Sequence, residues 1–438
     1  MKNIFILLAV IISYGTINAQ STAQIKKLVV SDSLRLIAIF KDLHQNPELA
    51  FMEVRTAAIV AKELKTLGYE VTTGIAKTGV VGILKNGNGP IIMYRADMDC
   101  NAVKETTGLP YASTKTMKKE DGAEVPVMHA CGHDAHVTWL LGVAKMMVNF
   151  KSQWKGTLIF VAQPAEEVGQ GAAAMVNDKM YEKGVPMPDY LFGMHTFPIP
   201  IGTIYNAIGE RMAGTDQLDV TFYGIGGHGA HPENTKDPIV MGANAVLQYQ
   251  TLISRTLSPQ ADAVLTVGAF QAGFVNNVIP PSALLKLNLR WFNDKDRQTL
   301  LDGIKSINEG IAVANKLPKD LYPQITMKGF AYPVVNNDAM VDKVNAALTG
   351  LLSPEKIIRE IPAEMISEDF PQLVYGNSKK AASDFMWVGI ANPAVVAKAK
   401  ADGKQYPFYN HNGNYEVDLR AIPLGVEIGV SALLELFR

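Results

Sequence analysis

The sequence predicts an α/β protein with a mixed, mostly parallel sheet, flanking helices and an inserted α+β domain. Short apolar segments at residues 79–84, 90–94, 157–162 and 190–193 alternate with amphipathic helical segments, which is typical of a parallel sheet covered by helices. Near residue 209 the pattern changes to strands that alternate apolar and polar residues, as half-exposed strands do. At 438 residues the chain also exceeds what one hydrophobic core commonly supports.

The first residues differ in character from the rest of the chain. Lys2 precedes an apolar run at residues 4–12, and Ala19 ends a segment of small and polar residues. The run is too short to span a bilayer, so we expect a secretory signal peptide at residues 1–19, cleaved near Ala19. A retained membrane anchor is the alternative. The predicted location is therefore secreted or periplasmic, without a membrane anchor.

Residues 20–208 are expected to form the first part of a catalytic, metal-binding domain. Helices are predicted at residues 31–40, 57–67 and 137–150 from their apolar spacing. Polar side chains cluster where three apolar strands end, after Tyr94, Ala162 and Gly193. The carboxyl ends of strands are where open α/β sheets bind ligands, so we expect the functional site there.

Residues 209–331 are predicted to form the inserted domain, in a β-α-β-β-α-β order typical of the split, ferredoxin-like unit. The segments in that order are 217–223, 238–257, 263–270, 283–291, 294–314 and 324–329. Residues 332–438 return to the earlier style and complete the catalytic domain. Their predicted elements are a helix at 338–352, an apolar strand at 384–390 and an amphipathic helix at 424–437.

Charge and cysteine content exclude some functions. The formal net charge is -1 and the sequence has no long basic run, so nothing favours nucleic acid or an anionic membrane as partner. The two cysteines, Cys100 and Cys131, do not form a disulfide framework.

The segment from Met128 to His136 is the strongest chemical signal. It reads Met-His-Ala-Cys-Gly-His-Asp-Ala-His and holds three of the eight histidines and one of the two cysteines. Imidazole and thiolate bind borderline-soft divalent metals. A buried structural histidine is the alternative for one of them, such as His136, but it does not explain the whole cluster. The segment therefore predicts a metal site.

Further ligands can come from the strand ends. Glu166 and Glu167 follow a buried strand, so one carboxylate can bind metal while its neighbour acts as a general base; two solvated loop glutamates are the alternative. His195 lies near the next strand end. His411 is the only histidine in the last 200 residues and is either a ligand or a surface-loop histidine.

Five ligands are too many for one tetrahedral zinc but suit two metals about 3.5–4 Å apart. Such metals lower the pKa of a bound water from near 16 to roughly 7. A glutamate that binds no metal can then take the proton and pass it to a leaving amine. The sequence therefore favours hydrolysis of an amide-type bond.

Several separated motifs make the chain resemble the M20 family of metallopeptidases, in its amidohydrolase branch. That branch contains hydrolases of N-acyl amino acids, hippurate, aminobenzoyl-glutamate and indole-acetyl amino acid conjugates. The motifs are Leu43-His-Gln-Asn-Pro-Glu-Leu49, Arg95-Ala-Asp-Met-Asp99, His129-Ala-Cys-Gly-His-Asp134, Gln163-Pro-Ala-Glu-Glu167, Met194-His195, Gly226-Gly-His-Gly-Ala-His-Pro232, Asn277-Val-Ile-Pro280 and Ser367-Glu-Asp-Phe370.

The resemblance implies a role for each matching position. Two divalent ions, Zn²⁺ or Mn²⁺ with Co²⁺ and Ni²⁺ also possible, would bind to Cys131, His133, Glu167, His195 and His411. Glu166 would be the catalytic base, and Asp97 would orient a ligand imidazole.

The resemblance also implies that the inserted domain is a lid or dimerisation domain in a homodimer. His228 within it would help to stabilise the tetrahedral oxyanion, from a neighbouring subunit. Asn277 and Arg290 would contact the substrate carboxylate, for which the arginine fork is well suited; pairing on the sheet surface is an equal alternative for Arg290.

The chain departs from the family pattern at three places. Arg95 stands where other branches have a metal-binding histidine, and Cys100-Asn-Ala102 replaces the usual Ala-Leu-Pro. Leu419 stands where an acidic residue is usual. The expected function is cleavage of small-molecule N-acyl amino acids. The alternatives are a dipeptidase or carboxypeptidase of the same fold and, from another class, a non-catalytic periplasmic metal- or ligand-binding protein.

Overall fold

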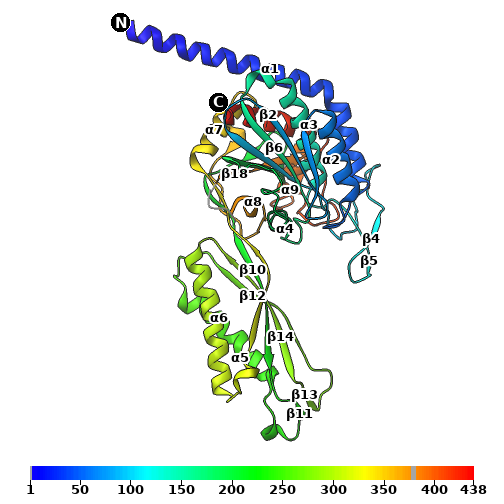
Figure 1. Ribbon diagram of the computed structural model, residues 1–438, viewed down its shortest axis with the longest axis vertical. Coiled ribbons are helices and arrows are strands. Elements are labelled where there is room, and N and C mark those ends of the chain that lie inside the picture. Colours follow the sequence, from blue (N-terminus) through cyan, green and yellow to red (C-terminus); the bar gives the residue numbers. More distant parts are fainter. Residues whose placement is uncertain (1, 376–380) are drawn as a thin grey trace. The chain divides into compact units, whose positions relative to one another are not determined.

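The computed structural model describes residues 2–375 and 381–438, which form two compact units (Figure 1). The first unit consists of Met1–Gly209, Val335–Pro362 and Asp369–Arg438, and the second of Glu210–Val334 and Ala363–Glu368. The second unit therefore interrupts the chain of the first. The lid or dimerisation role predicted for residues 209–331 stays a prediction.

An eight-stranded sheet forms the centre of the first unit. Its order is β1 (Glu70–Ile75), β2 (Gly79–Asn86), β6 (Gly156–Gln163), β3 (Ile91–Asp97), β7 (Tyr190–Pro200), β18 (Ala382–Ala391), β8 (Ile204–Tyr205) and β17 (Ile357–Ile358). The four central strands, β6, β3, β7 and β18, are parallel. They are apolar and buried along most of their length, as strands covered on both faces must be. The predicted mostly parallel sheet is confirmed.

Helices cover this sheet and carry much of the hydrophobic core. α3 (His133–Asn149) and α10 (Ala421–Leu436) pack on each other and are buried over nearly their whole length, and α3 also contacts β3 and β7. The remaining helices of this unit are α1 (Lys2–His44), α2 (Val54–Thr66), α4 (Gly171–Asn177), α7 (Asp338–Leu348), α8 (Gln372–Tyr375) and α9 (Pro393–Ala401).

The beginnings of α1 and α3 differ most from the prediction. α1 is continuous from Lys2 to His44, although the sequence pattern predicted a helix only at residues 31–40. α3 begins at His133 rather than at residue 137, because the polar residues 133–136 are buried in its first turn instead of forming a loop. Across the described residues, we find no helix with the length and apolar character needed to cross a membrane. The signal peptide stays a prediction.

The second unit has an antiparallel sheet in the order β12 (Val264–Ala272), β14 (Ser282–Trp291), β10 (Gly214–Tyr223) and β15 (Gln324–Ala331). Helices α5 (Pro238–Thr251) and α6 (Asp294–Ala314) pack against it and against each other. The chain order β10-α5-β12-β14-α6-β15 confirms the predicted ferredoxin-like element order. α5 is shorter than predicted because residues Leu252–Thr256 continue it as a π-helical turn.

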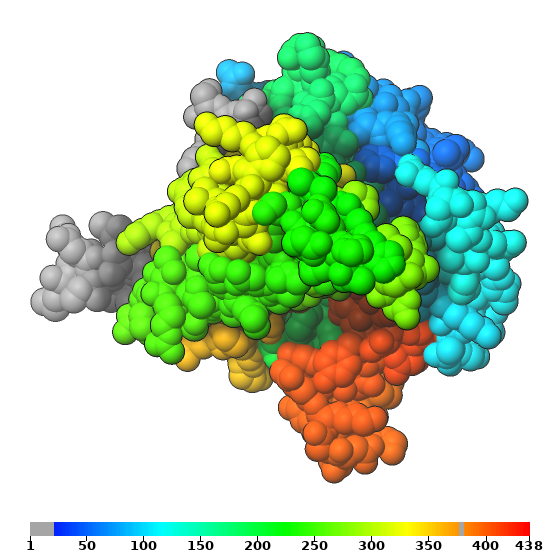
Figure 2. Space-filling view, turned by 90° about the horizontal axis from the view of Figure 1, so that it is seen from below, coloured from blue at the N-terminus to red at the C-terminus, as the bar shows by residue number. Residues whose placement is uncertain are grey.

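Three pairs of short strands were not predicted from the sequence pattern. β11 (Gly227–His228) pairs with β13 (Val278–Ile279), and β9 (Gly209–Met212) pairs with β16 (Val334–Asn336). β4 (Thr116–Lys118) and β5 (Glu124–Pro126) form a mostly exposed hairpin, in the cyan part of Figure 2.

Candidate metal centre

Cys131 and His133 are held in place by a left-handed glycine at the start of α3. Gly132 has φ +80° and is the residue before the helix. A Cβ atom there would lie 2.3 Å from Oγ1 of Thr196, so only glycine allows this close approach. Both flanking side chains are buried. The local backbone therefore turns a thiol and an imidazole into the same interior region.

The turn that carries Glu166 and Glu167 follows β6 directly. Asp99 fixes its backbone, because its Oδ1 accepts a hydrogen bond from the amide of Glu166 (3.1 Å) and its Oδ2 accepts one from the amide of Glu167 (3.0 Å). The turn also closes on itself, with the amide of Gly169 donating to the carbonyl of Glu166 (2.7 Å). Two adjacent glutamates are thus presented from a fixed backbone.

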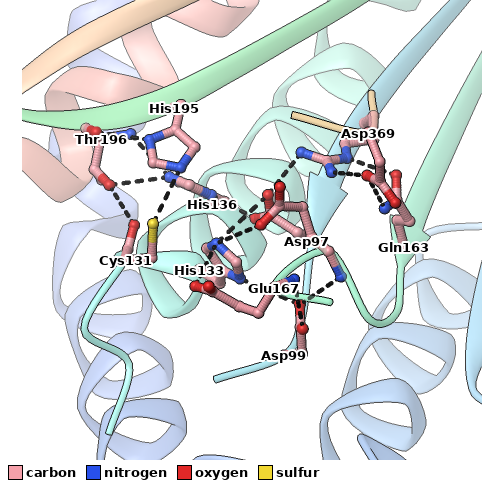
Figure 3. A network of polar contacts seen from close by, with 12 residues as sticks. Asp97, Asp99, Cys131, His133, His136, Gln163, Glu167, His195, Thr196 and Asp369 are labelled. Atoms are coloured by element: carbon pink, nitrogen blue, oxygen red, sulfur yellow. Dashed lines mark hydrogen bonds and ion pairs between the residues drawn. The ribbon is translucent and has the colours of Figure 1, made fainter. Parts of the chain in front are cut away.

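The five residues predicted to bind metal lie together (Figure 3 labels all except His411). Potential ligand atoms of Cys131, His133 and Glu167 all lie within 4.8 Å of one another. His195 joins them through Nε2, 3.4 Å from the Cys131 sulfur. His411 joins through Nε2, 3.2 Å from Oε2 of Glu167. The cluster is therefore built from four separate chain segments.

His195 is not at a strand end, contrary to the prediction. β7 continues to Pro200, and His195 lies within it opposite Trp387 of β18. It is nevertheless accessible to the cluster because β3 stops pairing with β7 at Gly193. The Nδ1 atom of His195 donates to the carbonyl of Thr196 (2.7 Å), which fixes the tautomer and leaves Nε2 free to bind a metal.

The other two histidines of the 128–136 segment have different environments. Nδ1 of His136 lies 2.5 Å from Oδ1 of Asp97, and its Nε2 accepts a hydrogen bond from the amide of Thr196 (2.8 Å). Both ring nitrogens are thus engaged, so His136 cannot serve as a ligand without losing a bond. His129 is buried, and burial lowers its pKa to about 4. It is therefore neutral at physiological pH.

A buried network of hydrogen bonds and ion pairs lies beside the predicted ligands (Figure 3). Asp97 accepts a 2.6 Å hydrogen bond from Nη1 of Arg95, and its Oδ2 is 3.7 Å from Nε2 of His133. Arg95 also donates to Gln163 (2.8 Å) and to Asp369 (3.1 Å). Arg95 therefore neutralises carboxylates beside the cluster instead of binding metal. From the sequence, Arg95 was noted only because other branches of the family have a metal-binding histidine at this position.

Three further residues that the sequence did not single out contact the cluster. Oγ1 of Thr196 donates to the carbonyl of Cys131 (2.8 Å) and accepts a hydrogen bond from the hydroxyl of Tyr415 (2.8 Å). Nδ2 of Asn410 lies 3.2 Å from the Cys131 sulfur. Among these, only Asn410 carried a signal, as the neighbour of His411.

The departures from the family pattern have structural roles outside the ligand set. Cys100 is buried, its amide donates to the carbonyl of Glu48 (2.9 Å), and burial raises the pKa of its thiol well above the usual value. Leu419 is half-buried and packs against the hydrophobic core of the first unit.

The electrostatics of the cluster favour positive charge. Burial raises the pKa of the Cys131 thiol to about 12 and that of the Glu167 carboxyl to about 7, and each anionic form is further disfavoured by a nearby carboxylate. Burial opposes a charge on His133, but Asp97 and Asp99 overcome this and hold its pKa well above the usual value. A cation in this region would lower the pKa of the thiol and the carboxyl.

The residues present fit a divalent metal. Both ring nitrogens of His133 and Oε1 of Glu167 are buried and form no well-directed hydrogen bond with any described residue. Buried polar atoms ordinarily have partners, and a thiol, imidazoles and a carboxylate form the donor set of borderline-soft metals. Metal binding would satisfy Oε1 of Glu167 and one ring nitrogen of His133.

His228, Asn277 and Arg290 belong to the second unit, so their roles stay predictions. His228 and Asn277 are exposed in the paired β11–β13 region, where the amide of Gly229 donates to the carbonyl of Asn277 (2.8 Å). Arg290 lies on β14 and donates through Nε to Asn288 (2.8 Å). Its Nη1 is buried and has no hydrogen-bond partner among the described residues.

The chain matches the model of peptidase family M20/M25/M40 over residues 93–435. The chain belongs to the M20 family. It is 39% identical to a hippurate hydrolase from Campylobacter jejuni, over 78% of this chain and 85% of the relative. It is 32% identical to an IAA-amino acid hydrolase from Arabidopsis thaliana, over 90% of this chain and 84% of the relative.

A solved structure supports the same conclusion. A dinuclear metal-binding M20 peptidase from Bacillus subtilis is 26% identical, with a TM-score of 0.71 over 92% of this chain and 99% of the other. Its fold and the two relatives place this M20 chain in the amidohydrolase branch, as predicted. The chain is accordingly a metal-dependent amidohydrolase, so the non-catalytic alternative is wrong.

Proposed function

We propose that this M20 enzyme cleaves the amide bond of N-acyl amino acids with Glu166 as its general base. The hippurate hydrolase and the IAA-amino acid hydrolase support this substrate class, because both names describe amino acids carrying an acyl group. The proposal includes two divalent cations, held by Cys131, His133, Glu167, His195 and His411. The clustering of these side chains and the dinuclear B. subtilis neighbour support the metal count.

One observation carries the assignment of Glu166. Glu167 shares a group of potential ligands with Cys131 and His133, whereas the adjacent Glu166 is grouped with Asp97 and not with the thiol. Oε1 of Glu167 and Oε2 of Glu166 lie 3.7 and 3.9 Å from Nε2 of His133. Asp99 holds both amides of the pair. The two carboxylates therefore reach the same region from one fixed turn, and of the two Glu167 is the one grouped with the Cys131 thiol.

Each side chain then has a defined task. The cations, when bound, supply positive charge that favours ionisation of water and stabilises a developing oxyanion. Glu166 takes a proton from the attacking water and delivers it to the nitrogen of the leaving amino acid. Asp97 and the Thr196 carbonyl keep imidazoles oriented, which preserves ligand geometry. The products are a carboxylic acid and a free amino acid.

Replacing each glutamate separately tests the division of labour. Glu166→Gln should retain bound metal and lower kcat by about 10²–10⁴-fold, the usual contribution of a general base. Its matched control, Glu167→Gln, should lose metal content in elemental analysis, because it removes a ligand. Full activity of Glu166→Gln would refute the proposed mechanism.

The substrate class is tested by a panel of hippurate, N-acetyl amino acids, indole-acetyl amino acids and dipeptides. We expect hydrolysis of the N-acyl amino acids. Turnover of dipeptides with no action on any acyl amino acid would favour the peptidase alternative.

Elemental analysis of protein purified without added metal identifies the ion. The Cys131 thiol favours Zn²⁺, while the carboxylate and imidazoles also accept Mn²⁺, Co²⁺ or Ni²⁺.

We also propose a homodimer that uses the second unit. β12 is an edge strand of its sheet, and α5 exposes Val240 and Leu247 at 62% and 73%. An unpaired edge beside exposed apolar side chains is typical of an association surface. Light scattering should give twice the chain mass, and Leu247→Glu should reduce it. A monomeric wild type would refute the dimer.

In such a dimer, His228 is proposed to stabilise the oxyanion, and Asn277 and Arg290 to bind the substrate carboxylate. The unpartnered Nη1 of Arg290 supports its share of this role. Arg290→Lys should raise KM more than it lowers kcat, because it removes a bidentate donor. An unchanged KM would favour the surface-pairing alternative.

Secretion is proposed from residues 1–19. The apolar run at residues 4–12 and the small residue at Ala19 support a cleavable signal peptide. Mass spectrometry of the protein isolated from its native host should give a chain that starts at Gln20. An intact N-terminus would contradict the proposal.

A further inference from the structure

Glu53 is fully buried and lies at the N-cap position of α2, but its side chain does not cap the helix. It precedes α2 as the N-cap residue, yet it makes no hydrogen bond to the helix amides. The side chain of a preferred N-cap residue, such as Asp or Ser, accepts a hydrogen bond from one of these amides. Here Glu48 does so instead, accepting from the amides of Arg55 (2.9 Å) and Thr56 (2.8 Å).

The carboxylate of Glu53 points to the turn that carries Glu166 and Glu167. Its Oε1 accepts a 2.9 Å hydrogen bond from the amide of Ala165, the residue before Glu166. The same oxygen accepts from the amide of Phe51 (2.9 Å), and Oε2 accepts from the hydroxyl of Thr78 (2.5 Å). The side chain therefore ties the start of α2, the β1–β2 turn and the Glu166–Glu167 turn together.

The contact to Ala165 falls where the backbone needs support. Ala165 is completely buried and has φ +53°, in the left-handed region that a residue with a Cβ rarely adopts. A local strain of this kind persists only where surrounding contacts enforce it. Asp99 holds the two amides that follow, so Glu53 and Asp99 together bind three consecutive amides, of Ala165, Glu166 and Glu167.

We propose that Glu53 is a positioning residue for the reaction, which holds the Glu166–Glu167 turn in its productive conformation through the amide of Ala165. This inference rests on the proposed roles of Glu166 and Glu167. Without Glu53, Ala165 relaxes from the left-handed conformation and both carboxylates shift. A displacement of about 1 Å at a catalytic group can lower the rate on the order of 100-fold.

The test compares Glu53→Ala, Glu53→Gln and a matched control, Glu48→Ala. Glu53→Ala should lower kcat by about 10- to 100-fold with KM changed less than about threefold, since it misplaces groups of the chemical step. It should also weaken Zn²⁺ binding to the metal-free protein in a chelator competition, because Glu167 moves with the turn. Glu53→Gln should restore both quantities, because its Oε1 still accepts from the amides and its Nε2 can donate to Thr78.

Glu48→Ala removes two amide contacts of similar kind at α2 but none to the turn. It should lower the melting temperature while leaving kcat and Zn²⁺ affinity at wild-type values. If Glu53→Ala does not fold, Glu53→Asp takes its place. The shorter side chain cannot reach Ala165 and Thr78 together, so the same losses are expected.

The outcomes separate this inference from the proposed function. Wild-type kcat and Zn²⁺ affinity in the folded Glu53→Ala or Glu53→Asp variant, with Glu166→Gln inactive, would overturn the role of Glu53 and leave the function standing. Equal losses in Glu53→Gln and Glu53→Ala would also overturn it, since hydrogen-bond acceptance would not be the cause. Full activity of Glu166→Gln would instead refute the proposed function itself.

Discussion

Replacing Gly132 by alanine should destabilise the protein far more than an alanine at a comparable glycine elsewhere. Gly132 has φ +80°, and a Cβ there would approach Oγ1 of Thr196 to 2.3 Å. The left-handed conformation costs an L-residue about 1–2 kcal/mol. Thr196 must also move, which breaks its hydroxyl hydrogen bonds to the Cys131 carbonyl and from Tyr415.

The two terms add to a definite expectation. Each lost hydrogen bond contributes about 1 kcal/mol net, so the displaced Thr196 adds about 2 kcal/mol to the backbone term. Gly132→Ala should therefore lower the free energy of unfolding by about 3–4 kcal/mol. Gly68 provides the control, because its φ is +85° and nothing lies within 4 Å of its hypothetical Cβ. Gly68→Ala should cost only the backbone term, about 1–2 kcal/mol.

Urea unfolding of both variants, with a chelator present to remove any contribution of bound metal, measures the difference. Zn²⁺ affinity gives a second measurement, since Gly132 lies between two proposed ligands and Gly68 does not. Equal losses of stability in the two variants would refute the argument from the Thr196 contact. An unchanged Zn²⁺ affinity in Gly132→Ala would refute the claim that this backbone positions Cys131 and His133.

Three further predictions concern the metal and pH. Asp97→Asn should weaken Zn²⁺ binding by about 10- to 100-fold in a chelator competition, because Asp97 orients histidines of the cluster; unchanged affinity would contradict this role. Removing the metal should lower the free energy of unfolding by about 2.7 kcal/mol relative to protein with free Zn²⁺ at a hundredfold excess over Kd, which urea unfolding with and without chelator measures; identical curves would argue against a bound ion. Burial raises the pKa of Asp384 to about 7, only partly opposed by Asn206. Because the folded state favours the neutral acid, the contribution of Asp384 to stability is greatest below pH 4 and falls by roughly 4 kcal/mol as the pH rises to 7. Asp384→Asn should abolish that decline in urea unfolding at pH 5 and 7.5, and a decline that persists would contradict it.

The proposed ligands could be recognised in the sequence because their chemistry is specific. A cysteine, three histidines and an acidic pair that follows an apolar strand have few other reasons to occur together. Thr196 offered no such signal, although it contacts both Cys131 and His136. A threonine at the end of an apolar segment fits any strand, so its role depends on which residues the fold brings opposite it.

The ends of strands and helices that depend on long-range pairing could not be predicted from the sequence either. His195 was expected at a strand end, but β7 is extended to Pro200 by pairing with β18, about 190 residues later in the chain. α3 was expected to begin at residue 137, since residues 133–136 are polar. Their burial against β7 and β3 makes the same residues the first turn of the helix.

Glu53 shows the same limit for an acidic residue. Glu53 lies four residues before the helix predicted at 57–67, and the sequence indicated no role for it. Only the fold reveals that Glu48 accepts from the helix amides and that Glu53 binds Ala165. Tertiary contacts thus assign two neighbouring glutamates opposite tasks. One stabilises a helix, and the other stabilises a strained turn.

The acidic groups around the cluster differ in how their charge is balanced, and this difference locates the cation. Asp97 is neutralised by Arg95 and hydrogen-bonded to His136, while Asp99 is satisfied by backbone amides. Glu167 lies 3.2 Å from His411 and 3.7 Å from His133, yet burial still raises its pKa to about 7. The thiol of Cys131 lies beside Glu167, and burial likewise raises its pKa, to about 12. His133 favours both anions, but burial outweighs its effect, and His195 is held neutral by burial. A bound cation would stabilise both groups as anions. The charges of Asp97 and Asp99 are already compensated by neighbouring groups. The charge of a bound metal therefore acts mainly on its ligands and on Glu166.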